Sequence, residues 1–319
     1  MFDLGEVRSA PVPLPGYSSA SAWRLRTEAG WWVVKAQYAI EHWEVEAMRH
    51  SGDLERAALA AGIAVPRPVE GGEEAAGFWA PVPGGTEYLR VSAWVDGARA
   101  ELPAGRELAA WLGGTVAALA AVAPPADVRQ GRGYPLHPLA QWEEWLSTES
   151  VGRREKARLL SAVADGTPLV QDALAASRAP FVLSHRDINH RNILLTPHGP
   201  TLIDFDQAGP EVPWWELVHF AFLLACASLG EDEPDPVLLG AAVSAFADQG
   251  GDVGELDSSA FAGLLRGMLE WPAANLMVLA GDAPAARRGE ALRQIAEAAR
   301  VLPVIMGFVE RWVAVLRAL

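Results

Sequence analysis

The pattern of residues along this chain of 319 residues changes abruptly at Asp96-Gly97. Before this point, short β-prone runs alternate with turn signals, and a single helical stretch lies among them. After it, alanine- and leucine-rich segments of helical character follow one another almost to the last residue. We therefore predict two domains, a β-rich one over residues 1–96 and a larger, mainly helical one over residues 97–319.

The first domain is predicted to contain two pairs of strands and one helix. A turn signal separates Ala22 to Arg26 from Trp31 to Gln37, so these runs should form a hairpin. A helix should follow from Ile40 to Ala61, with an interruption near Ser51-Gly52. Two more strands are expected at Phe78 to Pro81 and Tyr88 to Val95.

The second domain is predicted to be built mainly of helices. Its strand signals are confined to Phe181 to Leu183 and to a tight pair near Ile193 to Phe205. The helical segments are expected at residues 104–122, 138–149, 153–177, 213–229, 235–249, 257–280 and 284–318.

The charge balance limits the partners that the protein can have. The 26 basic residues against 40 acidic ones give a formal net charge of −14, which disfavours nucleic acid and favours cationic or neutral small molecules. The lone Cys226 excludes an internal disulfide, and neither a signal peptide nor a membrane-spanning run is recognisable. We expect a cytoplasmic monomer or homodimer that binds no membrane.

One segment carries a pattern that points to chemistry. Residues 184–195 read S-H-R-D-I-N-H-R-N-I-L-L, and residues 201–206 read T-L-I-D-F-D, with turn residues between them. If residues 197–200 form the connection of a hairpin, Thr196 faces Thr201 and Ile193 faces Asp204. Asn192 then lies diagonally beside Asp204, within reach of a shared ligand.

This predicted geometry suits phosphoryl transfer. Oxygen ligands from Asn192 and Asp204 favour Mg²⁺ completed by phosphate oxygens and water. Asp187, on the loop that enters the hairpin, can reach a hydroxyl held beside that ion. Phosphoryl transfer needs such a carboxylate to orient the hydroxyl and accept its proton, and a cation to neutralise the phosphates.

The spacing H-R-D-x-x-x-x-N, followed by an apolar strand and I-D-F, resembles the catalytic and metal-binding loops of kinase-like phosphotransferases. It is most similar to the aminoglycoside phosphotransferase family. The resemblance implies an α+β, two-lobed protein-kinase-like fold, with a small β-rich N-lobe, a larger helical C-lobe, and an ATP or GTP site between them.

The resemblance also implies nucleotide-binding residues in the first domain. Lys35, in W-V-V-K, is similar to the strand lysine that contacts phosphates and pairs with a helix glutamate, for which Glu55 is the first choice and Glu46 the rival. The loop at residues 16–21, with Ser18 and Ser19, resembles a phosphate-covering loop, although it lacks the G-x-G-x-x-G pattern. By position, the carbonyl of Ala93 and the amide of Val95 would contact adenine.

The acceptor is expected to be a small molecule. Only ten positions separate Asp204 from Trp214, so the long activation segment with which protein kinases hold peptides is missing. The resemblance and the acidic balance favour an aminated acceptor, such as an aminoglycoside-like antibiotic. Two alternatives stay open: a kinase of a metabolite such as an amino alcohol or sugar, and a non-catalytic nucleotide-binding pseudokinase.

Several polar and aromatic residues admit both structural and functional interpretations. His185 is interpreted as a support of the catalytic loop, and Glu216 likewise. The tryptophans at 142, 145, 214 and 215 have helical spacing that favours packing in a core. The acidic residues that could contact a cationic acceptor are Asp206, Glu211, Glu216 and Glu270.

Overall fold

A computed structural model describes residues 2–14, 21–38, 42–128, 135–147, 151–226, 233–281, 283 and 285–319. Every strand pairing in this part of the chain is antiparallel. The strands are β1 (Val12–Pro13), β2 (Ser21–Thr27), β3 (Gly30–Tyr38), β4 (Trp79–Pro81), β5 (Glu87–Ala93), β6 (Ala98–Arg99), β7 (Val182–Ser184), β8 (Ile193–Thr196), β9 (Gly199–Leu202) and β10 (Gly209–Glu211).

Helices lie at nearly all the positions that the sequence predicts. The α-helices are α1 (His42–Ala60), α2 (Arg106–Val122), α3 (Leu139–Leu146), α4 (Arg153–Ala176), α5 (Pro213–Ala225), α6 (Pro236–Asp248), α7 (Ala262–Ala280) and α8 (Ala285–Arg317). Three short 3-10 turns are η1 (His190–Asn192), η2 (Phe205–Gln207) and η3 (Ser258–Phe261). Within the described residues, no helix is both long and apolar enough to cross a membrane.

The chain divides into two compact units, each made of several segments of the sequence. The first unit comprises residues 1–101, 115–133 and 181–211, and the second comprises 102–114, 134–180 and 212–319. The segment 181–211, which carries the catalytic motif, therefore belongs to the same unit as the N-terminal sheet. The predicted boundary between residues 96 and 97 stays a prediction.

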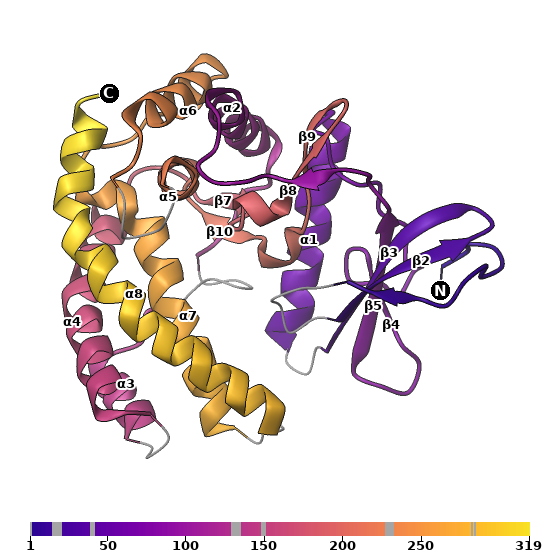
Figure 1. Ribbon diagram of the computed structural model, residues 1–319, viewed down its shortest axis with the longest axis horizontal. Helices are drawn as coiled ribbons and strands as arrows, with labels where there is room; N and C mark the ends of the chain where they lie inside the picture. The colour runs from indigo at the N-terminus through magenta and orange to yellow at the C-terminus, as the bar shows by residue number, and fades with distance from the viewer. Residues whose placement is uncertain are drawn as a thin grey trace. The chain divides into compact units, whose positions relative to one another are not determined.

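The first unit is built on a five-stranded sheet with the order β1-β2-β3-β5-β4, accompanied by α1 (Figure 1). A three-stranded sheet β6-β8-β9 and a two-stranded sheet β10-β7 complete its strands. Helix α1 packs against η2, and it also contacts β7 and β10. Helix α1, which precedes β4 in sequence, therefore lies beside η2, the turn that follows β9.

Helix α1 differs from its prediction in one respect: it runs without interruption through Ser51 and Gly52. Gly52 lies where the backbone of Gly77 crosses the helix, and a Cβ at Gly52 would stand only 2.5 Å from the Cα of Gly77. The glycine is therefore explained by this close approach rather than by a break in the helix. Its cost to helix propensity is offset by burial of Leu54 and Ala58 on the same helix.

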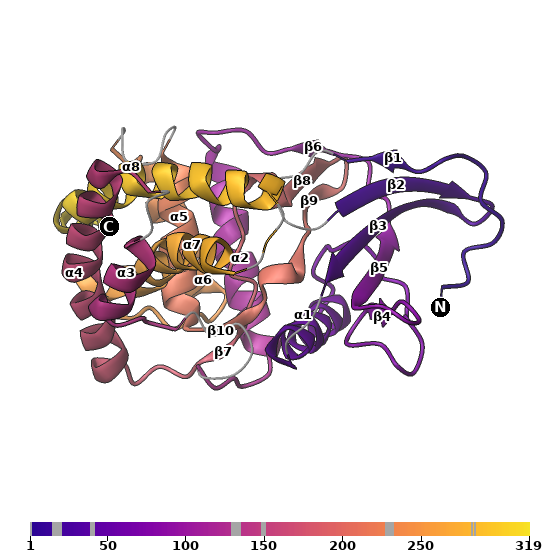
Figure 2. The same cartoon turned by 90° about the horizontal axis from the view of Figure 1, so that it is seen from below.

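The second unit is a helical assembly whose core is apolar and partly aromatic. Helices α7 and α8 pack against one another, and α4 packs against both of them (Figure 2). Phe222 of α5, Phe261 and Trp312 of α8 form a cluster with ring centroids 4.9 to 5.9 Å apart. The alanine- and leucine-rich sequence of this unit is thus the sequence of a buried helix core.

Candidate active site

Lys35 projects from the middle of the five-stranded sheet. It lies on β3 directly opposite Arg90 of β5, so both side chains leave the same face of the sheet. The Lys35 Nζ donates to Asp204 Oδ1 at 2.7 Å and to Asp206 Oδ2 at 2.9 Å. Burial alone would lower the pKa of Lys35, but the two carboxylates hold that pKa above its ordinary value.

Glu55 does not pair with Lys35, contrary to the prediction from the family pattern. Glu55 pairs with Arg90 instead. The Arg90 Nη2 donates to both carboxylate oxygens of Glu55 at 2.6 Å, and the Arg90 Nη1 donates to Asp206 Oδ1 at 3.2 Å. Burial raises the pKa of Glu55, and the Arg90 guanidinium opposes that rise. The rival Glu46 faces His42 at 3.4 Å on the exposed side of α1.

The hairpin that carries the metal-binding motif has a register two residues away from the predicted one. Ile193 faces Leu202 and Thr196 faces Gly199, because the connection has two residues rather than four. Gly199 takes a φ of 112°, which residues with a side chain rarely adopt, and this closes the tighter turn. A shift by two keeps the side chains of both strands on their predicted faces.

Asp204 follows immediately after this hairpin. The Ile203 N–H donates to the Asn192 carbonyl at 2.9 Å, which places Asp204 one residue past the position opposite Asn192. Asp204 takes a φ of 69°, a left-handed conformation that aspartate tolerates better than most residues. Burial would raise the pKa of its carboxyl, but the Lys35 ammonium holds that pKa below its usual value.

Asp187 is fixed by the amides of two asparagines. Asn189 Nδ2 donates to Asp187 Oδ1 at 2.5 Å, and Asn192 Nδ2 donates to Asp187 Oδ2 at 2.7 Å. Burial and the nearby charge of Asp204 raise the pKa of Asp187 to about 7, against the effect of these hydrogen bonds. Asn189, which also accepts from the Arg191 N–H, is a site residue that the sequence analysis does not predict. Its position between the Asp and the Asn of the motif is the sequence feature that indicates it.

His185 lies beneath the same loop. Its Nε2 is 3.1 Å from the Ile203 carbonyl, and its Nδ1 is 3.2 Å from the Asp187 N–H. These contacts require the neutral tautomer that carries its proton on Nε2. Complete burial lowers the pKa of His185 to about 4, so the ring is neutral over the ordinary pH range and ties the loop of Asp187 to the strand before Asp204.

The residues expected to hold a divalent cation fit that task in their donor atoms. The amide nitrogen of Asn192 donates to the backbone oxygen of Asp187 at 2.9 Å and also to its carboxylate. The amide oxygen of Asn192 is therefore directed away from Asp187. Asp204 supplies a carboxylate across the same ladder. An amide oxygen and a carboxylate oxygen are ligands that Mg²⁺ takes together with phosphate oxygens and water. Among the described residues, no group of three or more His, Cys, Asp or Glu side chains that could hold a metal is present.

The remaining nucleotide-binding predictions fall partly outside the described residues, where Ser18 and Ser19 lie. At the end of β5, the Trp94 N–H donates to the Trp31 carbonyl and the Ala93 N–H donates to the Arg67 carbonyl. Strand alternation therefore turns the backbone groups of Ala93 away from β3. Whether Ala93 and Val95 contact a nucleobase stays a prediction.

A stack of cationic and aromatic side chains lies further along the same face of the sheet. The Arg24 guanidinium lies 4.0 Å from the ring centre of Trp31 and 4.4 Å from that of Trp94. Trp94 is held in turn by a hydrogen bond from its Nε1 to Asp96. The Arg24 Nε is buried and has no hydrogen-bond partner within the part of the chain that the structure describes.

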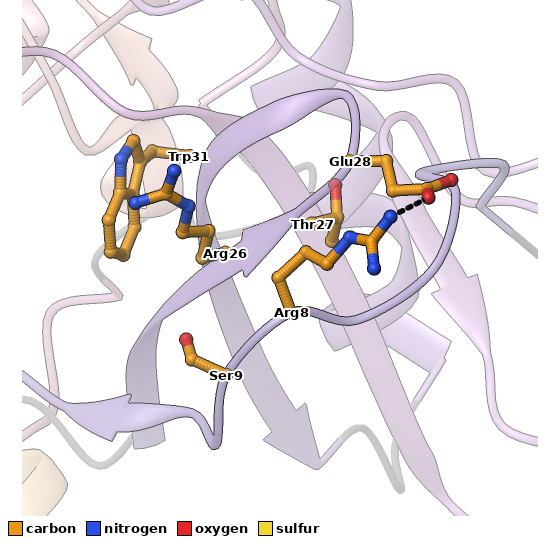
Figure 3. Close-up of a pocket in the computed structure, with 6 residues that line it drawn as sticks. All are labelled: Arg8, Ser9, Arg26, Thr27, Glu28 and Trp31. Carbon is orange, nitrogen blue, oxygen red and sulfur yellow. Dashed lines mark hydrogen bonds and ion pairs between the residues drawn. The ribbon is translucent and has the colours of Figure 1, made fainter.

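A cavity of about 630 Å³ opens at the end of this stack, lined by Arg8, Ser9, Arg26, Thr27, Glu28 and Trp31. Figure 3 shows Arg8 paired with Glu28, and the Arg26 guanidinium beside the indole of Trp31. None of the residues predicted for phosphoryl transfer lines this cavity. The candidate active site is the group of Lys35, Asp187, Asn192 and Asp204, defined by the hydrogen bonds described above.

The other acidic candidates have structural surroundings. Asp206 is held by Lys35 and Arg90, and Glu211 is buried on β10. In the second unit, Glu216 is buried in the first turn of α5, and Glu270 lies 3.7 Å from His137. The buried Trp142, Trp214 and Trp215 belong to the core of that unit.

Comparison with known proteins agrees with this arrangement. A sequence model described as the phosphotransferase enzyme family matches residues 12–256. The chain therefore belongs to the aminoglycoside phosphotransferase family and is a small-molecule phosphotransferase. No curated protein matches the chain.

Solved structures share the fold at low sequence identity. An amicoumacin kinase in complex with AMP-PNP, Ca²⁺ and Ami is 18% identical, with a TM-score of 0.62 over 94% of this chain and 91% of that one. A spectinomycin phosphotransferase in complex with ADP and spectinomycin is 12% identical, with a TM-score of 0.58 over 92% and 93%. A choline/ethanolamine kinase family protein from Mesorhizobium loti is 19% identical, with a TM-score of 0.56 over 97% and 93%. The predicted kinase-like α+β fold, with an antiparallel sheet near the N-terminus and a larger helical part, is confirmed.

Proposed function

We propose that this protein transfers the terminal phosphoryl group of ATP or GTP to a hydroxyl of a small, polar, aminated molecule, in the manner of an aminoglycoside phosphotransferase. The observation that carries the proposal is the convergence of Lys35, Asp187, Asn192 and Asp204 within one compact unit. Each of these residues supplies a group that phosphoryl transfer requires.

In this proposal Asp187 orients the acceptor hydroxyl and receives its proton. The bonds from Asn189 and Asn192 fix both carboxylate oxygens, which reduces the motion that would misplace the hydroxyl. A pKa of about 7 is close to neutral pH, where a general base combines availability with driving force. His185 supports the same loop through its backbone without taking up a proton itself.

Lys35 is proposed to bind phosphate oxygens of the nucleotide, while Asn192 and Asp204 are proposed to hold Mg²⁺. When bound, this ion would neutralise phosphate charge and orient the transferred group. The backbone of Ala93 and Val95, and the loop with Ser18 and Ser19, are proposed to contact the base and the phosphates respectively. Glu55 is proposed to support this site through Arg90, whose guanidinium binds both Glu55 and Asp206.

Two observations support an aminated acceptor: the net charge of the protein and the names of kinases that share its fold. A net charge of −14 favours molecules that carry amines, and solved structures of the same fold include kinases whose names specify antibiotics and amino alcohols. An aminoglycoside-like antibiotic is therefore the acceptor that we propose first. Amino alcohols and sugars belong in the same test, because the family includes kinases of metabolites.

The direct experiment is an ADP- or GDP-release assay over a panel of aminoglycosides, other aminated antibiotics, amino alcohols and sugars. Mass spectrometry should then detect an acceptor that has gained one phosphoryl group. The Asp187→Asn variant serves as the control for contaminating kinases. Nucleotide binding without turnover on any acceptor would contradict the proposal and favour a protein that only binds nucleotide.

A further inference from the structure

The Lys35 ammonium is shared between two carboxylates that differ in how firmly they are held. Asp204 and Asp206 both lie within hydrogen-bond distance of its Nζ, at 2.7 and 2.9 Å. The side chain of Asp204 is 30% exposed, whereas that of Asp206 is 15% exposed. The more accessible of the two is also the one that carries the proposed metal-binding role.

Asp206 is the end of a chain of buried ion pairs. Its second oxygen accepts from Arg90 at 3.2 Å, and Arg90 binds both oxygens of Glu55. Arg90 and Glu55 are 6% and 0% exposed, so this pair has little freedom to rearrange. Among the described residues, Asp204 receives its hydrogen bond from Lys35 and none from Arg90, whose charge also helps to lower the pKa of the Asp204 carboxyl.

The charges of the five groups do not balance. With all of them ionised, the two cations Lys35 and Arg90 meet the three anions Glu55, Asp204 and Asp206, which leaves one negative charge. A nucleotide without a divalent ion would approach a cluster of its own sign, and its phosphates would compete with Asp204 for the same ammonium. While it donates to both carboxylates, the ammonium has only one N–H left for phosphate.

We propose that Asp206 is the positioning residue of Lys35, and that Asp204 partly blocks the lysine, by occupying one of its N–H donors and part of its charge, until the Asp204 carboxylate is engaged elsewhere. Asp206, held by Arg90 and Glu55, keeps the ammonium in place when Asp204 is used for a divalent ion. The role that the family pattern gives to a helix glutamate is here taken by Asp206, with Glu55 one ion pair further away. This inference rests on the proposed nucleotide site.

The first test is nucleotide binding by isothermal titration, with ADP in EDTA and with ADP in excess Mg²⁺. Asp204→Asn should bind metal-free ADP about tenfold more tightly than the wild type, because Lys35 is released and one negative charge is removed. Asp248→Asn, at the exposed end of α6, is the matched control for the change in net charge. Equal affinities of Asp204→Asn and Asp248→Asn for metal-free ADP would overturn the blocking role.

The second test separates positioning from mere structural support. Asp206→Asn should raise the KM for Mg-nucleotide about 10- to 100-fold while changing kcat much less, because the cation that binds phosphate loses its anchor. Asp206→Glu should recover part of the affinity. A variant whose kcat falls with an unchanged KM would contradict the positioning role, and if Asp206→Asn fails to fold, Arg90→Lys takes its place with the same expectation.

The composition of the chain allows Lys35 to be observed directly. The sequence contains only two lysines, Lys35 and Lys156, so protein labelled with ε-¹³C lysine gives two side-chain NMR signals, which Lys156→Arg assigns. Without ligand, Asp204→Asn and Asp206→Asn should each shift the Lys35 signal and leave Lys156 unchanged. A Lys35 signal identical in wild type and Asp206→Asn would overturn the inference even if the protein binds Mg-ADP, whereas absence of Mg-ADP binding by the wild type would instead contradict the proposed function.

Discussion

Two pairs of basic residues occupy the same face of the five-stranded sheet, and their surroundings are opposite. Lys35 and Arg90 are bound by the carboxylates of Glu55, Asp204 and Asp206. Arg24 and Arg26 lie against the indoles of Trp31 and Trp94, and no carboxylate contact of theirs is present in the described residues. Trp31 and Lys35 are four residues apart on β3, which corresponds to about 13 Å.

We call the part of this face around Lys35 and Arg90 the carboxylate end, and the part around Arg24, Arg26 and Trp31 the indole end. The difference in their surroundings indicates that the two ends bind different parts of a ligand. A cation bound by carboxylates can exchange those partners for phosphates, and it is held at a fixed point until it does so. A guanidinium held between rings keeps the N–H donors on its edge available for neutral acceptors or hydroxyls. The separation of the two ends is comparable to the span from the β-phosphate to the base of a nucleotide, so we expect one end to bind phosphates and the other to bind the nucleoside.

The largest expected effect comes from the carboxylate end. Asp187→Asn should lower kcat about 10²- to 10⁴-fold, because it removes the proton acceptor while keeping a side chain that Asn189 and Asn192 can still contact. The dissociation constant for Mg-ADP should stay within about threefold of the wild type. Wild-type turnover in this variant would remove Asp187 from the chemistry and leave the carboxylate end with a binding role only.

Acid should destabilise the folded protein through His185, which supports the loop of Asp187. His185 has a pKa of about 4 in the folded protein, below the unfolded value of 6.5, so its contribution is fully present above pH 6.5 and is lost as pH falls through 4. The loss approaches about 3 kcal/mol in the free energy of unfolding. Asp187, whose folded pKa of about 7 lies above its unfolded value, contributes with the opposite sign over the same range, so the test is the difference between two proteins. In urea unfolding from pH 7 to pH 4, His185→Gln should lose less stability than the wild type as the pH falls.

The control for that experiment lies in the second unit. His219 of α5, whose pKa burial lowers to about 3, should add a loss that also begins near pH 6.5 and continues to about pH 3. Between pH 6.5 and 4 both imidazoles are protonated only in the unfolded chain, so the two substitutions should reduce the slope alike. Below pH 4 the His219 contribution continues, so the slope there should be reduced by His219→Gln and not by His185→Gln. A slope below pH 4 that His185→Gln reduces as much as His219→Gln would contradict the pKa of about 4 for His185.

Much of this arrangement is predictable from sequence because it depends on local patterns. The helices of the second unit follow from apolar periodicity, and their ends follow from glycine and proline. Asp187, Asn192 and Asp204 are predictable as a set because a hairpin shift of two residues changes neither the face nor the order of its side chains. Local signals thus define the catalytic end even where the exact register is wrong.

The remaining features depend on contacts between segments distant in sequence. Glu55 binds Arg90 because β3 and β5 pair with Lys35 opposite Arg90, and no local pattern specifies that register. Gly52 looks like a helix break until the backbone of Gly77 is placed against it. Strands β1 and β6 have two residues each and β10 has three, which is too short for an alternating pattern to be recognised.

Substitution of Lys35 should have an intermediate effect and should show what the carboxylate end recognises. Lys35→Met removes the ammonium and keeps an unbranched apolar stem, so affinity for Mg-ATP should fall about 10- to 100-fold. Affinity for Mg-tripolyphosphate, which has no nucleoside, should fall by a similar factor, since the lost contacts are to phosphate. Isothermal titration of both ligands measures this, and a loss confined to the nucleotide would place the phosphates elsewhere.

The smallest effect is expected at the indole end, and it is the one that decides whether the two ends differ in function. Arg24→Met keeps contact with Trp31 and Trp94 but removes the donors of the guanidinium. Mg-ATP and Mg-GTP should therefore bind up to about tenfold more weakly. Mg-tripolyphosphate, which has no nucleoside, should bind as in the wild type. Arg26→Met, next along β2 on the same face and further from Lys35, is the matched control and should change neither affinity. A parallel loss of nucleotide and tripolyphosphate affinity in Arg24→Met would show that its charge acts on phosphate, and the two ends of the sheet face would then form a single electropositive surface.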